Sequence, residues 1–229
     1  MINEKVTEIT VVYKTINYAE MCVKTLRHFY PDMKIVLVNT SPPDDPCTEY
    51  CQILAKMDQN MLLVDLQQNY GHGPALNIGM LEVDTEFAYI FDSDVRMDRG
   101  GMIEQLMELV TPEVYGAGWI CYTDKAGGGC KNHFHGDKRE PHEVSYLHPF
   151  ACLVRTSEYE CFPEFALWGA PFTQPMNAIF ERGLSDQKIK PFNVKQYVTH
   201  FSGGTRALYG DWPGKEPKSY GRDAMVCKR

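Results

Sequence analysis

Residues 87–94 read FAYIFDSD, and this stretch decides the fold class of the chain. Its first five residues are apolar or aromatic without interruption, which is typical of a strand buried on both faces of a parallel sheet. Asp92 and Asp94 follow the run directly, with Ser93 between them. Because ligands bind at the carboxyl ends of such strands, the stretch predicts an α/β fold with an acidic site at one edge of its sheet.

Strand-like and helix-like segments alternate before this stretch. Runs of β-branched and apolar residues at 9–13, 34–38 and 61–64 predict three further strands. Apolar residues at helical spacing follow the first strand, and we expect Asn17 to cap that helix together with Glu20. Asp45-Pro46 opens a second helix with proline at its first position. The alternation predicts a mostly parallel, Rossmann-like sheet flanked by helices.

The second half of the chain is less regular. Residues 114–121 and 145–155 predict strands, and the polar segment 122–143 between them predicts a loop. Apolar spacing over 172–180 predicts a helix, with Pro175 in its first turns. We therefore expect a smaller mixed region beside the parallel sheet.

The two carboxylates invite a chemical interpretation. Negative charges at the end of a buried strand cost free energy unless a cation binds them. Carboxylate oxygens are hard ligands, which suit Mg²⁺ or Mn²⁺ bound to a phosphate. The alternative is an ordinary strand-to-turn junction, where Asp and Ser are favoured for local hydrogen bonds. The tripeptide alone favours the turn, but its position in the chain and the neighbouring segments favour a metal site.

Those segments carry a resemblance to family 2 glycosyltransferases and their GT-A relatives. Thr15 and Asn17 match the family's turn after the first strand, and Asn39 follows the second strand. The glycine-rich segment 69–79 and the Asp92–Asp94 pair come next, in the same order as in the family. The similarity is strong to about residue 120. It is thinner to about residue 206, through segments 148–155 and 162–169 and through His200.

The resemblance implies a nucleotide diphosphate-sugar donor, with a UDP-sugar favoured, and an acceptor hydroxyl on a carbohydrate or another molecule. It implies a divalent cofactor, Mn²⁺ or Mg²⁺, held by Asp92, Asp94 and His200, and it makes Asp94 and His200 catalytic. The residues that it places around the donor are Thr15, Asn17, Asn39, Asn69, Gly71, Asn77, Asp92, Ser93, Asp94 and Trp168, to which we add Arg206 from the basic tail.

The chain departs from the family pattern in ways that leave alternatives open. Asn39 stands where the family usually has an aspartate for the base, and Trp168-Gly169 is followed by no acidic residue. Inverting transfer needs a general base, and Glu164 and Asp186 are the nearest carboxylates in sequence. Inverting and retaining chemistry both stay open, as does a degenerate sugar-nucleotide-binding module. A nucleotidyltransferase is less favoured, because residues 13–17 contain no glycine.

Composition narrows the function classes. The net charge of −7 argues against a nucleic-acid partner. No run approaches the ~20 apolar residues of a membrane span, and the first residues begin no apolar leader, so we expect a cytoplasmic protein. None of the eight cysteines forms a Cys-x-x-Cys pair. We expect all of them to be reduced.

We expect one GT-A domain over residues 1–206, with a nucleotide-sugar half (1–120) and an acceptor half (121–206). The tail 207–229 follows. From Ser202 onward there are six basic and three acidic residues, so this segment is +3 and the remainder, with 17 basic and 27 acidic residues, is −10. A lid that closes over the donor through Arg206, Lys215 and Lys218 is one interpretation of the tail, and a solvated end is the other. The glycine-rich segment 127–135 predicts a mobile loop beside the acceptor cleft.

Overall fold

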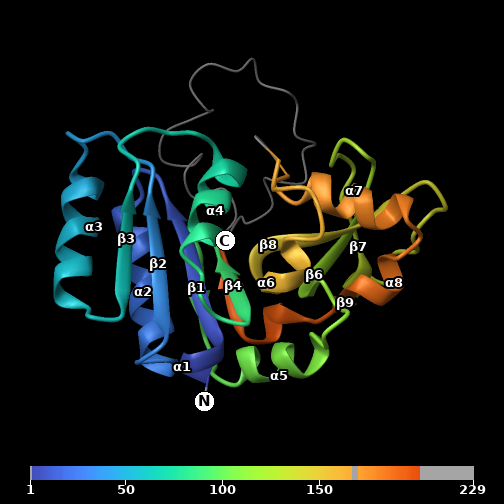
Figure 1. Cartoon of the computed structure of the whole chain (residues 1–229), viewed down its shortest axis with the longest axis horizontal. Helices are drawn as coiled ribbons and strands as arrows, with labels where there is room; N and C mark the ends of the chain where they lie inside the picture. The colour runs from blue at the N-terminus through green and yellow to red at the C-terminus, as the bar shows by residue number, and fades with distance from the viewer. Residues whose placement is uncertain (1, 167–169, 202–229) are drawn as a thin grey trace.

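The computed structural model describes residues 2–166 and 170–201. Four parallel strands form one half of its central sheet (Figure 1): β1 (Val6–Val12), β2 (Lys34–Asn39), β3 (Met61–Asp65) and β4 (Phe87–Phe91). Their order in the sheet is β3-β2-β1-β4. The carboxyl ends of all four strands therefore meet at one edge, as parallel pairing requires.

The sheet continues beyond β4 with reversed strands. β8 (Val144–Arg155) runs antiparallel to β4, β6 (Gly116–Thr123) runs antiparallel to β8, and the short β7 (Lys131–Asn132) pairs with β6. β9 (Ile189–Pro191) also pairs with β6, in parallel. The α/β fold with a mixed second region is confirmed.

Helices cover both faces of the sheet. α2 (Ile16–Phe29), α3 (Pro46–Met57) and α5 (Met102–Leu109) bury apolar residues against one face. α4 (His72–Leu81), in front of the sheet in Figure 1, and α7 (Thr173–Glu181) do so against the other. The short elements are α1 (Ile2–Lys5), α6 (Thr156–Tyr159), α8 (Ser185–Lys188) and the 3-10 turns His133–His135 and Val194–Gln196.

A two-stranded ribbon completes the architecture. β5 (Val95–Met97) follows the Asp92–Asp94 pair, and β10 (Val198–His200) pairs with it antiparallel, so that His200 lies opposite Val95. The backbone N–H of Phe201 donates to the carbonyl oxygen of Asp94 at 2.9 Å. The ribbon thus brings residue 200 to residue 94, which are far apart in the sequence.

Two expectations from the sequence were wrong. Thr15 occupies the N-cap position of α2 without a side-chain capping bond, and Asn17 lies exposed in the first turn, because the helix begins at Ile16. Cys121 and Cys130 form a disulfide, so the cysteines are not all reduced. The pairing is possible because Cys121 lies on β6 opposite Asn132 of β7, which brings Cys130 beside it with the two Cα atoms 5.5 Å apart.

Other expected elements lie close to their expected positions, although β1 begins at Val6, three residues before the expected start at Ile9. β6 and β8 lie where strands were expected, and α7 carries Pro175 in its first turn, where the missing N–H costs no helical hydrogen bond. The expected loop 122–143 also contains β7 and one 3-10 turn. Among the described residues, no helix is long and apolar enough to cross a membrane.

Candidate active site

Asp92, Asp94 and His200 form one cluster at the carboxyl end of β4. Each offers one ligand atom, and these atoms lie within 4.8 Å of one another. His200 Nε2 is 3.3 Å from Asp94 Oδ1. Two carboxylates and an imidazole, all partly buried, make a donor set that suits a divalent ion. The structure thus brings together the three residues that the sequence proposed as ligands.

The backbone around the cluster is held on both sides. The N–H of Asp92 donates to the carbonyl oxygen of Phe150 on β8 at 3.0 Å. The carbonyl oxygen of Asp92 accepts from the N–H of Val95 at 3.0 Å, which closes a tight turn around Ser93. The Phe150 ring stacks on the His200 ring, with centroids 4.6 Å apart. The carboxylates therefore sit on a backbone fixed by β4, β8 and the β5–β10 ribbon.

Two further histidines lie beside this cluster, and the sequence analysis missed both. His72 Nε2, at the start of α4, is 3.3 Å from Asp92 Oδ1. His148, on β8, has its ring centroid 6.1 Å from that of His200. Both lie in segments that carry the family resemblance, 69–79 and 148–155, but the local sequence singles out neither histidine, because their nearness to the carboxylates depends on which elements pack together.

The histidines and Asp92 affect each other's protonation. Burial alone would lower the pKa of His72, but the Asp92 carboxylate outweighs it and raises the pKa. Burial likewise opposes ionisation of Asp92, and His72 reverses this to hold the pKa of Asp92 below its ordinary value. Burial, aided by His200, lowers the pKa of His148 to about 4. Asp92 therefore favours the protonated form of His72, and burial favours the neutral form of His148.

Asn39 lies buried at the carboxyl end of β2, and its side chain is oriented by the protein. Its Oδ1 accepts from the backbone N–H of Ser41 at 3.0 Å, which fixes the direction of the amide. Its Nδ2 donates to Thr48 Oγ1 at 2.9 Å and to Asp65 Oδ1 at 3.0 Å. Both amide hydrogens are thereby used, so Asn39 has only a lone pair left to offer.

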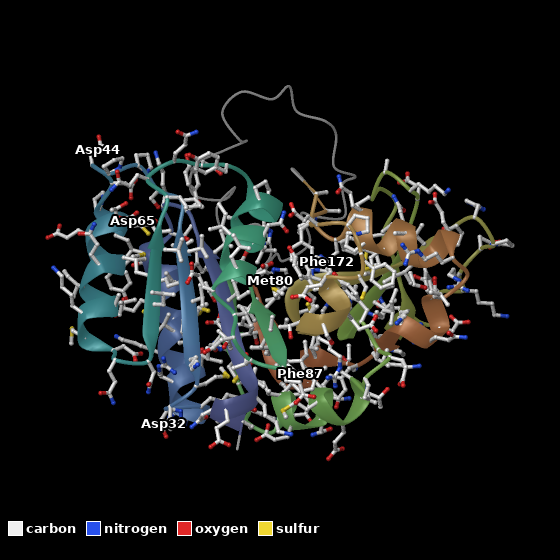
Figure 2. The ribbon with its side chains drawn as sticks, viewed as in Figure 1. Asp32, Asp44, Asp65, Met80, Phe87 and Phe172 are labelled. Atoms are coloured by element: carbon white, nitrogen blue, oxygen red, sulfur yellow. A yellow bond between two sulfur atoms is a disulfide. The ribbon has the colours of Figure 1, made fainter. Side chains whose placement is uncertain are left out.

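Asp65 is a neighbour that the sequence analysis also missed. It ends β3 in register with Asn39, at the upper end of the strand in Figure 2. Its second carboxylate oxygen, Oδ2, accepts from Gln52 Nε2 at 3.2 Å. Position could have revealed it, since a polar residue that ends a parallel strand lies at the same edge as Asn39 and Asp92.

The other proposed donor residues take different positions at this edge. Thr15 follows β1, and its buried Oγ1 has no hydrogen-bond partner among the described residues. Asn69 Oδ1 accepts from the N–H of Gly71 at 2.9 Å, and Gly71, with φ of 96°, caps α4 in a conformation that L side chains rarely adopt. Asn17 lies exposed on α2.

Asn77 is committed to a contact within the protein. Its Oδ1 accepts from Tyr159 Oη and from the N–H of Phe165, both at 3.0 Å, and its Nδ2 donates to the Phe165 carbonyl oxygen at 3.2 Å. These bonds fasten α4 to the segment 159–166. A Cβ on Gly73, one turn earlier, would lie 1.7 Å from the Ala166 carbonyl oxygen, so this contact needs glycine.

Some proposed residues lie outside the described ranges or apart from the cluster. Trp168, Arg206 and the tail 207–229 are outside the described residues. Glu164 is exposed. Asp186 lies on α8 beside β6 and β9, where its Oδ1 is 3.5 Å from Arg139 Nη1. In the sheet order, β6 is two strands from β4.

The Asp92–Asp94 pair thus follows the last parallel strand of the sheet, and His200 reaches it from a separate two-stranded ribbon. The sequence profile of Glycosyl transferase family 2 matches residues 8–161, which is more than half of the chain. The chain belongs to glycosyl transferase family 2.

Individual proteins are similar to this chain in sequence or in structure. A teichoic acid poly(glycerol phosphate) polymerase of Staphylococcus epidermidis is 28% identical over 91 residues, which cover 39% of this chain and 13% of the relative. The mannosyltransferase PcManGT from Pyrobaculum calidifontis, solved in complex with GDP-Man and Mn²⁺, has a TM-score of 0.62 at 15% identity, covering 82% of this chain and 55% of the other.

A second solved structure has the same fold. TarS of S. aureus, residues 1–349, has a TM-score of 0.56 at 15% identity, covering 86% of this chain and 60% of the other. The same TarS segment in complex with UDP-GlcNAc has a TM-score of 0.54. The chain thus spans just over half the length of these structures and 13% of the polymerase. At these identities the solved structures establish the fold alone.

Proposed function

We propose that the protein transfers a sugar from a nucleotide diphosphate-sugar, with a UDP-sugar favoured, to a hydroxyl of a carbohydrate or another acceptor. The observation that carries this proposal is the cluster of Asp92, Asp94 and His200 at the carboxyl edge of a family 2 sheet. Two of the similar structures were solved in complex with GDP-Man and with UDP-GlcNAc, which supports a nucleotide-sugar donor.

The residues of the cluster fit a divalent ion. Asp92 and Asp94 supply hard oxygen atoms and His200 supplies an imidazole nitrogen, a set that suits Mn²⁺ and also admits Mg²⁺. Because the protein carries a net charge of −7, binding of a negatively charged diphosphate needs a local cation. When bound there, such an ion supplies Lewis-acid stabilisation to the departing nucleotide diphosphate.

The chain's own residues prepare the site around that cluster. His72 holds the Asp92 carboxylate from α4, and the β5–β10 ribbon holds His200 against Asp94. The stacked Phe150 ring restricts rotation of the His200 ring. Side chains that are already held in place lose less conformational entropy when they bind an ion, which favours a pre-organised site.

Asn39 supports uracil as the nucleobase of the donor. Its two amide hydrogens are bound by Thr48 and Asp65, so the free lone pair on its Oδ1 accepts a hydrogen bond much as a carboxylate would. The N3–H of uracil offers such a hydrogen. Thr15, whose buried Oγ1 has no partner among the described residues, follows the adjacent strand and offers a further polar contact.

The donor belongs over the β1–β4 half of the sheet, and the acceptor over β8, β6 and the elements that follow. The stereochemistry of transfer stays open, because neither Glu164 nor Asp186, the carboxylates nearest in sequence to Trp168-Gly169, matches the position of the family's general base. A degenerate sugar-nucleotide-binding protein would share the same donor site, so product formation is the measurement that separates the two functions.

The test is a panel of UDP-, GDP- and dTDP-sugars incubated with the protein and Mn²⁺, Mg²⁺ or EDTA. Release of nucleoside diphosphate is measured with and without carbohydrate acceptors. We expect metal-dependent release with at least one sugar nucleotide, and faster release when an acceptor is present. Tight nucleotide binding without any release would contradict transferase activity and favour the degenerate binding protein.

A further inference from the structure

A carboxyl group lies in the middle of the core, away from the cluster described above. Glu8 is on β1, in register with Ile35 of β2 and Tyr89 of β4, and it is 0% exposed. Among the described residues no cation lies within ion-pair distance of it, and its Oε2 has no hydrogen-bond partner. A buried carboxylate without a partner is costly, whereas a neutral carboxylic acid is far less so.

The groups around Glu8 favour the neutral acid. Cys22 and Arg27 of α2 and Tyr89 of β4 are the titratable and charged groups that face it. Arg27 Nε is 2.7 Å from Asp58 Oδ2, so that cation is already paired. Burial raises the pKa of the Cys22 thiol and of the Tyr89 hydroxyl, and both stay neutral. Burial raises the pKa of Glu8 to about 8, although Thr10 and Arg27 partly oppose this.

Thr10 connects Glu8 to the end of β4. Its Oγ1 is in hydrogen-bond contact with Glu8 Oε1 and, at 2.8 Å, with the carbonyl oxygen of Phe91. A hydroxyl has one hydrogen to donate. An ionised Glu8 and the Phe91 carbonyl would compete for it. A neutral Glu8 instead donates its own hydrogen to Thr10, and Thr10 donates to Phe91.

The peptide unit that Thr10 contacts leads directly into the candidate active site. The Phe91 carbonyl and the Asp92 N–H belong to one planar peptide group. Thr10 holds its carbonyl end, and the Phe150 carbonyl oxygen holds its N–H end at 3.0 Å. Rotation of this plane would move the Asp92 Cα and its carboxylate. Both hydrogen bonds therefore restrain the direction of Asp92, together with the Val95 N–H and His72.

We propose that Glu8, as a neutral acid, is a positioning residue that acts through Thr10 to hold the Phe91–Asp92 peptide and so to orient the Asp92 carboxylate. The inference rests on the proposed function for its catalytic consequence, but the hydrogen-bond chain itself does not. Ionisation of Glu8 breaks the chain and loosens the metal-binding edge, so donor use falls as the pH rises through about 8.

The test that needs no donor is the ¹H–¹⁵N resonance of the Asp92 amide, followed from pH 6 to 9.5 in the full chain carrying His72→Gln, because His72 contacts Asp92 and its own titration would move the same resonance. We expect an alkaline shift with its midpoint near 8 in this background, to which each variant of this titration is added. The shift should vanish in Glu8→Gln, whose amide donates to Thr10 without titrating, and in Thr10→Val, which has no hydroxyl. Thr7→Val is the matched control, because Thr7 is also buried on β1 but bonds Thr85 instead. It should leave the shift unchanged.

The second readout is metal-dependent turnover over the same pH range. Glu8→Gln should keep near-wild-type turnover at pH 7 and lose the alkaline decline, whereas Thr10→Val should fall about tenfold throughout. An alkaline Asp92 shift that persists in Glu8→Gln overturns the positioning role, and so does full turnover in Thr10→Val. If no sugar nucleotide is used at all, the proposed function fails while the amide titration still decides the hydrogen-bond chain.

Discussion

Asp94 is the residue on which the metal-site interpretation most depends. It lies 3.3 Å from His200 and within the same cluster as Asp92, on a backbone that β10 holds by the bond from Phe201. The bond from Phe201 is accepted by the main-chain carbonyl oxygen of Asp94, so a side-chain substitution changes the ligand set and keeps this bond.

Asp94→Ala should lower metal-dependent turnover about a hundredfold or more, in line with the loss of one group that stabilises developing charge. It should also weaken UDP binding in the presence of Mn²⁺. Steady-state kinetics and calorimetry check both effects. Asp84→Ala is the control, because it removes the same charge from a surface residue that pairs with Lys34. Wild-type turnover in EDTA would refute the expectation.

Asn39→Ala should act on donor binding more than on chemistry. Its Oδ1 is the acceptor proposed for the base, which lies away from the reacting bond. We expect KM for the donor to rise about tenfold with kcat little changed, as when ground-state and transition-state binding are lost equally. An unchanged donor KM, in a variant shown to be folded, would remove Asn39 from the site.

At the scale of single residues, the sequence predicted those positions that are determined by a local sequence pattern. Asp92 and Asp94 follow a buried strand and could be placed from that fact alone, and the family resemblance supplied His200. His72 and His148 could not be found, because a histidine becomes a neighbour of a carboxylate only through packing. Glu8 was missed because the expected strand began at Ile9, whereas β1 begins at Val6 and buries Glu8.

The contact between α4 and the segment 159–166 links the two regions of the sheet. α4 packs on the parallel strands, and the segment follows β8. Asn77 makes three hydrogen bonds across this contact, two of them to the backbone of Phe165. The segment thereby reaches the helix that carries His72.

Asn77→Ala should destabilise the protein by about 1–3 kcal/mol, because the backbone N–H of Phe165 would lose its partner. Denaturant unfolding measures this loss. Leu81→Ala is the matched control on the same helix, since Leu81 is 83% exposed, and it should change stability by less than about 0.5 kcal/mol. Equal stability of the two variants would show that the contact contributes nothing.

At the scale of elements, periodicity and strand composition predicted most of the sheet and helices. The cap of α2 was misplaced by two residues because Asn17 and Glu20 imitate a capping pattern inside the first turn. The Cys121–Cys130 disulfide was not foreseen, since its nine-residue separation becomes close only once β6 and β7 pair.

The stability of the whole molecule should depend on pH through Glu8. Its folded pKa of about 8 lies above the ordinary 4.5, so the folded state holds an extra proton between these values. This contribution to stability is full below about pH 4.5 and is lost as the pH rises through 8. The free energy of unfolding therefore falls with pH by at most about 1.4 kcal/mol per pH unit through this group.

Glu8→Gln should therefore flatten the fall in unfolding free energy between pH 5 and pH 8, measured by denaturant titration at several pH values. Glu82→Gln, at an exposed position on the C-cap of α4, should leave the slope as in the wild type. Parallel slopes for the wild type and Glu8→Gln would mean that Glu8 is ionised in the folded protein.

The central claim is that the carboxyl edge of the sheet holds a divalent ion together with a nucleoside diphosphate. The most direct measurement is the electron paramagnetic resonance signal of free Mn²⁺, titrated with protein in the presence of UDP or GDP. Mn²⁺–nucleotide mixtures without protein provide the baseline. We predict that the wild type depletes the free signal at about one ion per chain and that Asp94→Ala does not. Equal depletion by the two proteins, or none by the wild type with either nucleotide, would contradict the account.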